Sequence, residues 1–199
     1  EDEAAAAGRL VGALHAHAET FRWPDELQMA LVPPADRLLH AADALTTALD
    51  AADDRARLCD VVAAVADRTS AAGNGPEEIG PVHGDLRLRR LRRAAGEAGV
   101  LGFGNCRTGS FADDLSVLWS DLGGREATPA LRAALLDGYA SVRRAPRATP
   151  DELEAFASLR CLEGAARLVV DARTRRGVPA EVVEQVGREI RRAADALPL

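Results

Sequence analysis

The sequence predicts a mainly α-helical chain with one small β-hairpin near its middle. Three observations support this fold class. Alanine and leucine are abundant, aromatic residues make up only 4% of the chain and runs of β-branched residues are scarce, which is typical of helical proteins. Apolar residues recur at helical spacing on both sides of a central stretch. That stretch, residues 81–104, has no sustained helical period and is rich in glycine, which favours a loop followed by a hairpin with its turn near residues 95–98.

Three helices are expected before the central stretch. The first covers residues 4–21, and a connection containing prolines separates it from the second, residues 35–51. The third covers residues 54–70, with Asp53 or Asp54 as its N-cap. Apolar residues are expected on one side of the second helix: Leu38, Leu39, Ala42, Leu45 and Leu49.

Four helices are expected after the central stretch. Apolar spacing predicts one over residues 111–121. Thr128 and Thr149 are each followed by proline, a pairing typical of an N-cap and the first helical position, and Glu152 can complete a capping box with Thr149. Pro179 opens the last amphipathic helix.

Length and composition favour a single domain. The 199 residues would divide into first helices (1–80), a loop and hairpin (81–104) and later helices (105–199). All 25 basic residues are arginine, which suggests a bacterial genome of high GC content. The chain begins with Glu1 rather than methionine, so we expect a piece of a longer protein or a processed one.

Several functional classes are disfavoured by the same sequence. A net charge of −6 argues against a nucleic-acid-binding protein. No apolar stretch approaches the ~20 residues of a membrane span, and no signal peptide is recognisable. The cysteines are widely spaced and odd in number, so we expect reduced thiols and a cytoplasmic location.

Three short blocks in the central region follow a distinctive order: His83-Gly84-Asp85-Leu86, then Leu101-Gly102-Phe103-Gly104 after the hairpin, then Asp114-Leu115 at the start of a helix. This order resembles the C-terminal lobe of the aminoglycoside phosphotransferase and choline kinase-like family, which has a protein-kinase-like fold. The resemblance extends loosely over nearly the whole chain. It leaves out the β-rich N-terminal lobe of that family, so we expect such a lobe or a neighbouring domain as a partner in a longer protein.

The resemblance implies roles for several residues, and two of them conflict with catalysis. Asp85 would be the catalytic carboxylate, or a vestigial one that is retained as a structural residue of the loop, while His83 and Asp114 would support the structure of the catalytic loop. Arg90 occupies the position of a metal-binding asparagine, and Gly102 that of a metal-binding aspartate. An arginine side chain has no acceptor lone pair and glycine has no side chain, so neither can ligate Mg²⁺. We therefore expect an impaired metal site.

Two nearby residues are candidate substitute ligands for this site. Asn105 and Asp113 lie close to the affected positions in the sequence, but Mg²⁺ demands near-octahedral oxygen geometry, and we do not favour this substitution. Mg²⁺ and ATP or GTP are expected as cofactors only if the protein is active. His15 and His17 are two residues apart on a predicted helix and therefore face different directions, which disfavours a metal site.

A run of arginines follows the catalytic loop. It is either the solvated surface of a hairpin or a site for an anionic ligand that needs no metal. No aromatic residues interleave with it, which disfavours nucleic acid. The run contains Arg87, Arg89, Arg90, Arg92 and Arg93.

Three hypotheses about function remain open. The favoured one is a catalytically impaired, pseudokinase-type module that binds a ligand or acts as a scaffold. The second is an active ATP- or GTP-dependent small-molecule phosphotransferase with an altered metal site. The third is a structural helical module of a multidomain protein. The acceptor substrate, the nucleotide and the oligomeric state do not follow from the sequence.

Overall fold

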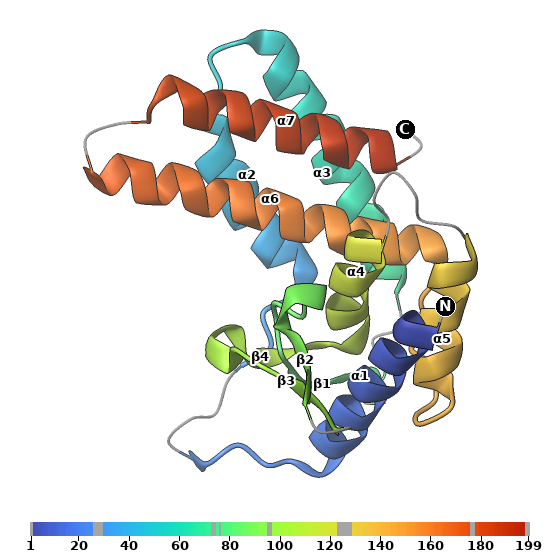
Figure 1. Ribbon diagram of the computed structural model, residues 1–199. Helices are drawn as coiled ribbons and strands as arrows, with labels where there is room; N and C mark the ends of the chain where they lie inside the picture. The colour runs from blue at the N-terminus through green and yellow to red at the C-terminus, as the bar shows by residue number, and fades with distance from the viewer. Residues whose placement is uncertain are drawn as a thin grey trace. The chain divides into compact units, whose positions relative to one another are not determined.

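The computed structural model confirms a mainly helical chain with a small β-hairpin (Figure 1). It describes residues 2–25, 30–72, 75, 77–94, 97–122, 129–175 and 178–197, with the backbone alone at residues 71, 93, 94, 97 and 175. The chain divides into two compact units. Unit 1 comprises Glu1–Leu31 and Gly73–Ala148, and unit 2 comprises Val32–Ala72 and Thr149–Leu199. No helix in the described ranges is both long enough and apolar enough to span a bilayer.

The described part of unit 1 contains two small antiparallel sheets and three helices. One sheet pairs β1 with β4, with Ile79 opposite Ser110 and Val82 opposite Arg107. The other is the hairpin of β2 and β3, with Leu91 opposite Val100. The elements of the unit, in chain order, are α1 (Asp2–Thr20), β1 (Ile79–Val82), the 3₁₀ turn η2 (Leu88–Arg90), β2 (Leu91–Ala94), β3 (Glu97–Val100), the 3₁₀ turn η3 (Phe103–Asn105), β4 (Arg107–Ser110), α4 (Phe111–Leu122) and α5 (Pro129–Ala140).

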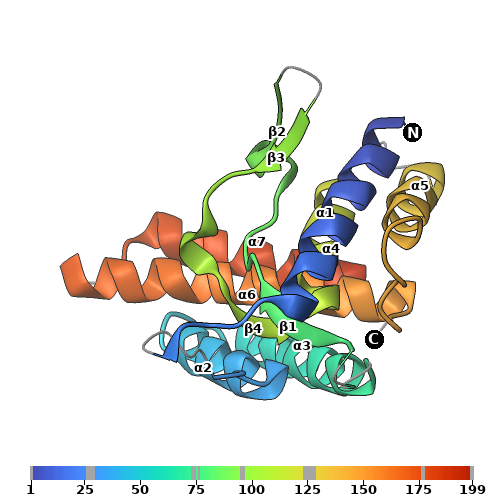
Figure 2. The ribbon, with the colours of Figure 1, turned by 90° about the horizontal axis from the view of Figure 1, so that it is seen from below.

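Glycines allow α1 and α5 to approach each other closely. Figure 2 shows the two helices side by side. A Cβ atom at Gly8 would overlap the backbone carbonyl of Leu135, and one at Gly138 would overlap the backbone carbonyl of Ala5. Because these neighbours are backbone atoms, they cannot rotate away. The close approach of the two helices therefore requires glycine, which has no side chain, at both positions.

Unit 2 is an assembly of four helices. They are α2 (Pro34–Thr46), α3 (Ala52–Ala71), α6 (Pro150–Arg175) and α7 (Ala180–Ala196). A bidentate pair joins α2 to α6: Arg37 donates from Nε and Nη2 to the two oxygens of Glu163, at 2.7 and 2.9 Å. Such fork-to-fork pairs fix geometry as well as adding energy. The core of the unit includes the buried residues Leu38, Leu45, Leu58, Val61, Leu153, Phe156, Leu159, Leu162 and Ile190.

Helix starts marked by proline were predicted well. α5 begins at Pro129 and α6 at Pro150. The capping box also forms, since the backbone N–H of Thr149 donates to Glu152 at 2.6 Å and that of Glu152 donates to Thr149 Oγ1 at 3.3 Å. Thr128 and part of the predicted turn at 95–98 lie outside the described residues.

Other local predictions were wrong. α3 has Ala51 at its N-cap, and both Asp53 and Asp54 lie inside its first turn, where a carboxylate favours the positive end of the helix without capping it. Leu39 was expected on the apolar side of α2, yet its side chain is 60% exposed. The pairing of β1 with β4 was not predicted, because neither four-residue strand shows an apolar alternation.

Candidate functional site

The loop predicted to be catalytic follows β1 in unit 1. Gly84 has a φ of 75°, and a Cβ atom there would overlap the backbone carbonyl oxygen of Asn105. Glycine is the residue that adopts this backbone at little cost and also leaves room for the neighbouring chain. Leu86, two residues later, is fully buried and anchors the loop in the core. Asp85 is therefore positioned between a tightly packed glycine, Gly84, and a buried leucine, Leu86.

Asp114, in the first turn of α4, binds the backbone of this loop. Its Oδ2 accepts a hydrogen bond from the backbone N–H of His83 at 2.7 Å, and its Oδ1 accepts one from that of Gly84 at 2.8 Å. Asp114 is fully buried, so these bonds satisfy loop donors that water does not reach. The carboxylate acts as a structural clamp between the loop and α4.

His15 extends this clamp to α1 and α5, a connection that the sequence did not reveal. Its Nε2 lies 3.2 Å from Oδ2 of Asp114, and its Nδ1 lies 2.9 Å from the Tyr139 hydroxyl. Each ring nitrogen of His15 therefore has a polar partner, one on α4 and one on α5. Burial raises the pKa of Tyr139 to about 12, so its hydroxyl stays protonated at neutral pH. His17 is exposed, in line with its different direction on the helix.

His83 connects the loop to the segment after the hairpin. Its Nε2 lies 3.1 Å from the backbone carbonyl of Leu101, and its Nδ1 accepts from the backbone N–H of Asp85 at 3.2 Å. Its ring also lies against that of Phe103, with centroids 4.9 Å apart. The two halves of the predicted site are therefore held together by one histidine.

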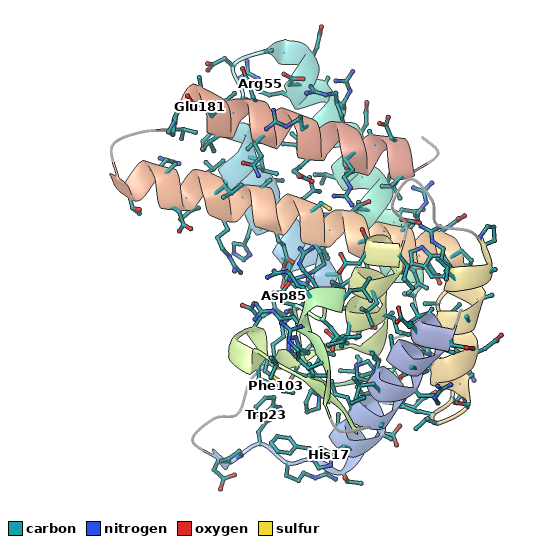
Figure 3. The ribbon with its side chains drawn as sticks, in the orientation of Figure 1. His17, Trp23, Arg55, Asp85, Phe103 and Glu181 are labelled. Carbon is teal, nitrogen blue, oxygen red and sulfur yellow. The ribbon has the colours of Figure 1, made fainter. Side chains whose placement is uncertain are left out.

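Asp85 is surrounded by guanidinium groups (Figure 3). Its Oδ1 accepts from Nε of Arg87 at 3.0 Å, and its Oδ2 accepts from Nη2 of Arg90 at 2.9 Å. Nη2 of Arg89 lies 3.7 Å from the same Oδ2. Burial by itself would raise the pKa of Asp85, but the hydrogen bonds from Arg90 and Arg87 outweigh burial and hold it below its usual value.

The two positions that the resemblance assigns to metal ligands are in contact. Gly102 has a φ of 85°, and a Cβ atom there would overlap Nη1 of Arg90. The guanidinium of Arg90 thus occupies space that a side chain at position 102 would need, while its other terminal nitrogen pairs with Asp85. A cation fixed to the chain lies next to the carboxylate, in the part of the site where the resemblance places Mg²⁺.

The two substitute ligands each have other neighbours in the structure. Asp113 is buried and pairs with Arg107, so its carboxylate already faces a cation. Asn105 is half-buried in η3 and contributes its backbone carbonyl to the tight packing against Gly84. Within the described ranges, no three His, Cys, Asp or Glu side chains are grouped as a metal site would require. The donor set present here does not fit Mg²⁺.

Arg92, the next arginine of the run, forms hydrogen bonds within its own segment. Nη1 of Arg92 donates to the backbone carbonyls of Arg89, at 2.6 Å, and Leu91, at 2.9 Å. Arg92 therefore folds back on its own segment. The side chain of Arg93 lies outside the described part of the chain.

Comparisons with known proteins identify the family and the fold of the chain. A family model described as "Phosphotransferase enzyme family" matches residues 1–156. No curated protein matches the sequence significantly. An amicoumacin kinase solved in complex with AMP-PNP, Ca²⁺ and Ami is similar in structure, with a TM-score of 0.71 and 18% identity over 98% of this chain and 60% of that one.

Two further solved structures show the same fold. They are a microcompartment-associated aminopropanol kinase (TM-score 0.71, 20% identity, 96% of this chain and 60% of that one) and a choline/ethanolamine kinase family protein from Mesorhizobium loti (TM-score 0.66, 12% identity, 98% and 60%). The chain spans about 60% of the length of all three. The structures show the fold, and the family model covers most of the chain. The chain therefore belongs to the phosphotransferase enzyme family.

Proposed function

We propose that this chain is a phosphotransferase-type domain in which magnesium-dependent phosphoryl transfer is impaired and ligand binding or scaffolding remains. The proposal rests on one observation, the position of Arg90 between Asp85 and Gly102. Phosphoryl transfer from a nucleotide depends on metal ions that bridge and neutralise the phosphate oxygens. A guanidinium supplies charge but no lone pair, so it cannot hold that metal.

Electrostatics support the same proposal. Mg²⁺ would have to approach a carboxylate that two guanidinium groups already bind. Like charges repel at such distances, and displacing Arg90 would also expose Asp85 without its partner. The similar amicoumacin kinase was solved with a nucleotide analogue and Ca²⁺, so the fold itself is compatible with both. The obstacle proposed here is local to Arg90 and Gly102.

The test is calorimetric titration of ATP and GTP into the longest natural form of the protein, first with Mg²⁺ and then with EDTA. The proposal predicts no binding that depends on Mg²⁺ and no transfer of phosphate. Nucleotide binding that requires Mg²⁺, with turnover that is lost in Asp85→Asn, would overturn it in favour of an active enzyme with an altered metal site.

A gain-of-function variant sharpens this test. Arg90→Asn together with Gly102→Asp removes the guanidinium and returns two oxygen ligands, and aspartate tolerates the left-handed backbone better than most residues. The double variant should bind Mg²⁺, whereas Arg92→Asn with Gly104→Asp, changed at neighbouring exposed positions, should not. Equal Mg²⁺ affinity of the two double variants would contradict the assigned role of Arg90.

A further inference from the structure

The surroundings of Asp85 carry more positive than negative charge. Three guanidinium groups face this part of the loop, those of Arg87, Arg89 and Arg90. The second carboxylate within reach belongs to Asp121, whose Oδ1 lies 3.6 Å from Nη1 of Arg87 and whose Oδ2 accepts from the backbone N–H of Leu88 at 2.9 Å. Among the side chains that the structure describes here, three cations against two carboxylates leave one positive charge in excess.

The exposed donors of this cluster are concentrated on Arg89. Its side chain is 66% exposed, and its 3.7 Å approach to Asp85 is too long for a hydrogen bond. In the part of the chain that the structure describes, the Arg89 side chain makes no other ion pair or hydrogen bond. Arg87 is also partly open to solvent, at 43% exposure. Several N–H groups of two neighbouring arginines are thus available to a ligand on the solvent side.

We propose that Arg87 and Arg89, backed by the charge of Arg90, form a metal-independent site for a phosphate group, either inorganic phosphate or the terminal phosphate of a small molecule. Planar guanidinium forks match the oxygens of a phosphate, and each charge-assisted hydrogen bond is stronger than a neutral one. The inference deepens the proposed function and rests on it, because a bound Mg²⁺ would compete for the same place.

Asp85 is the internal competitor of this ligand. It accepts hydrogen bonds from Arg87 and Arg90, so part of the donor capacity of the cluster is used within the protein. Asparagine has the same shape but no charge, and Asp85→Asn should release those donors and remove a repelling negative charge. Anion affinity should therefore rise.

The experiment is calorimetric titration of inorganic phosphate into the longest natural form of the protein, with EDTA present and ionic strength held constant with potassium chloride. Binding is expected for phosphate and not for chloride. Arg89→Gln should weaken it about tenfold or more, the loss of at least one charge-assisted hydrogen bond. Asp85→Asn should tighten it several-fold.

Arg92→Gln is the matched control. It removes one exposed arginine from the same stretch, but this guanidinium is bonded to the carbonyls of Arg89 and Leu91 and does not face Asp85. Phosphate affinity should stay within about twofold of the original, while Arg89→Gln lowers it. Equal losses of phosphate affinity in the two variants would mean that only the net charge of the protein matters, and would overturn the proposed site.

The outcomes separate this inference from the proposed function. Absence of phosphate binding, or weaker binding in Asp85→Asn, overturns the anion site alone. Nucleotide binding that requires Mg²⁺ in the unaltered protein overturns the proposed function, whatever the phosphate titration gives. Titration of AMP and ATP without metal then distinguishes a free phosphate ligand from a nucleotide phosphate, since a site for free phosphate gains nothing from the nucleoside.

Discussion

The contact between Arg90 and Gly102 predicts that two substitutions interact energetically. Gly102→Ala should cost roughly 1–2 kcal/mol for a left-handed backbone in a residue with a side chain. The new Cβ would also force the guanidinium of Arg90 to move, and we expect this movement to weaken its hydrogen bond to Asp85. A buried charge-assisted hydrogen bond contributes about 1.5–3 kcal/mol. The side chains of Arg90 and Asp85 are 30% and 12% exposed, so solvent screening reduces our expectation to about 1 kcal/mol.

A double-mutant cycle isolates that second contribution. In an Arg90→Ala background the guanidinium is already gone, so Gly102→Ala should cost only the backbone strain. The coupling free energy should therefore be about 1 kcal/mol, measured as free energies of unfolding from urea denaturation followed by circular dichroism. Gly104→Ala is the control, because a Cβ atom there has no neighbour within 4 Å. Additivity within about 0.3–0.5 kcal/mol would refute the reasoning.

Two further predictions concern the fold and its pH dependence. Gly138→Ala should destabilise the protein by about 1–3 kcal/mol, because the new Cβ would collide with a backbone carbonyl. Gly164→Ala, on an open part of α6, should instead stabilise the protein by roughly 0.5–1 kcal/mol. Urea denaturation of both variants measures these changes, and equal effects would contradict the close approach of α1 and α5. The pKa of Asp85 is lowered by folding, so its contribution to stability is present above its unfolded value, about 3.9, and is lost as pH falls through its lower folded value. The stability difference between the protein and Asp85→Asn should therefore shrink below about pH 4, and a difference that stays constant from pH 7 to pH 3 would be inconsistent with this assignment.

Local patterns were enough to predict the helices and the family. Proline after threonine marks the start of α6, and the apolar period of its first turns continues into a buried face. The ordered blocks around Asp85 were enough to identify the family, which the family model confirms. These features depend on residues that are close in the sequence, and such patterns are readable without a structure.

Long-range contacts were not predictable in this way. His15 looks like one polar residue on the apolar face of a helix, and only the structure brings it to Asp114 and Tyr139, which are 99 and 124 residues away. The sequence showed that Arg90 and Gly102 cannot ligate a metal. It could not show that the guanidinium of Arg90 fills the space where a side chain at position 102 would lie.

A metal ion normally supplies two properties together, and the guanidinium of Arg90 beside Gly102 can supply only one of them. Mg²⁺ neutralises phosphate charge, and it also accepts oxygen ligands and so aligns the groups that react. On the function proposed here, arginine retains the first property, since a fixed guanidinium attracts anions at any metal concentration. It loses the second, because its nitrogens are donors and its position follows the chain rather than the substrate. Phosphate binding without transfer is therefore the coherent outcome of a site in which Arg90 is held between Asp85 and Gly102.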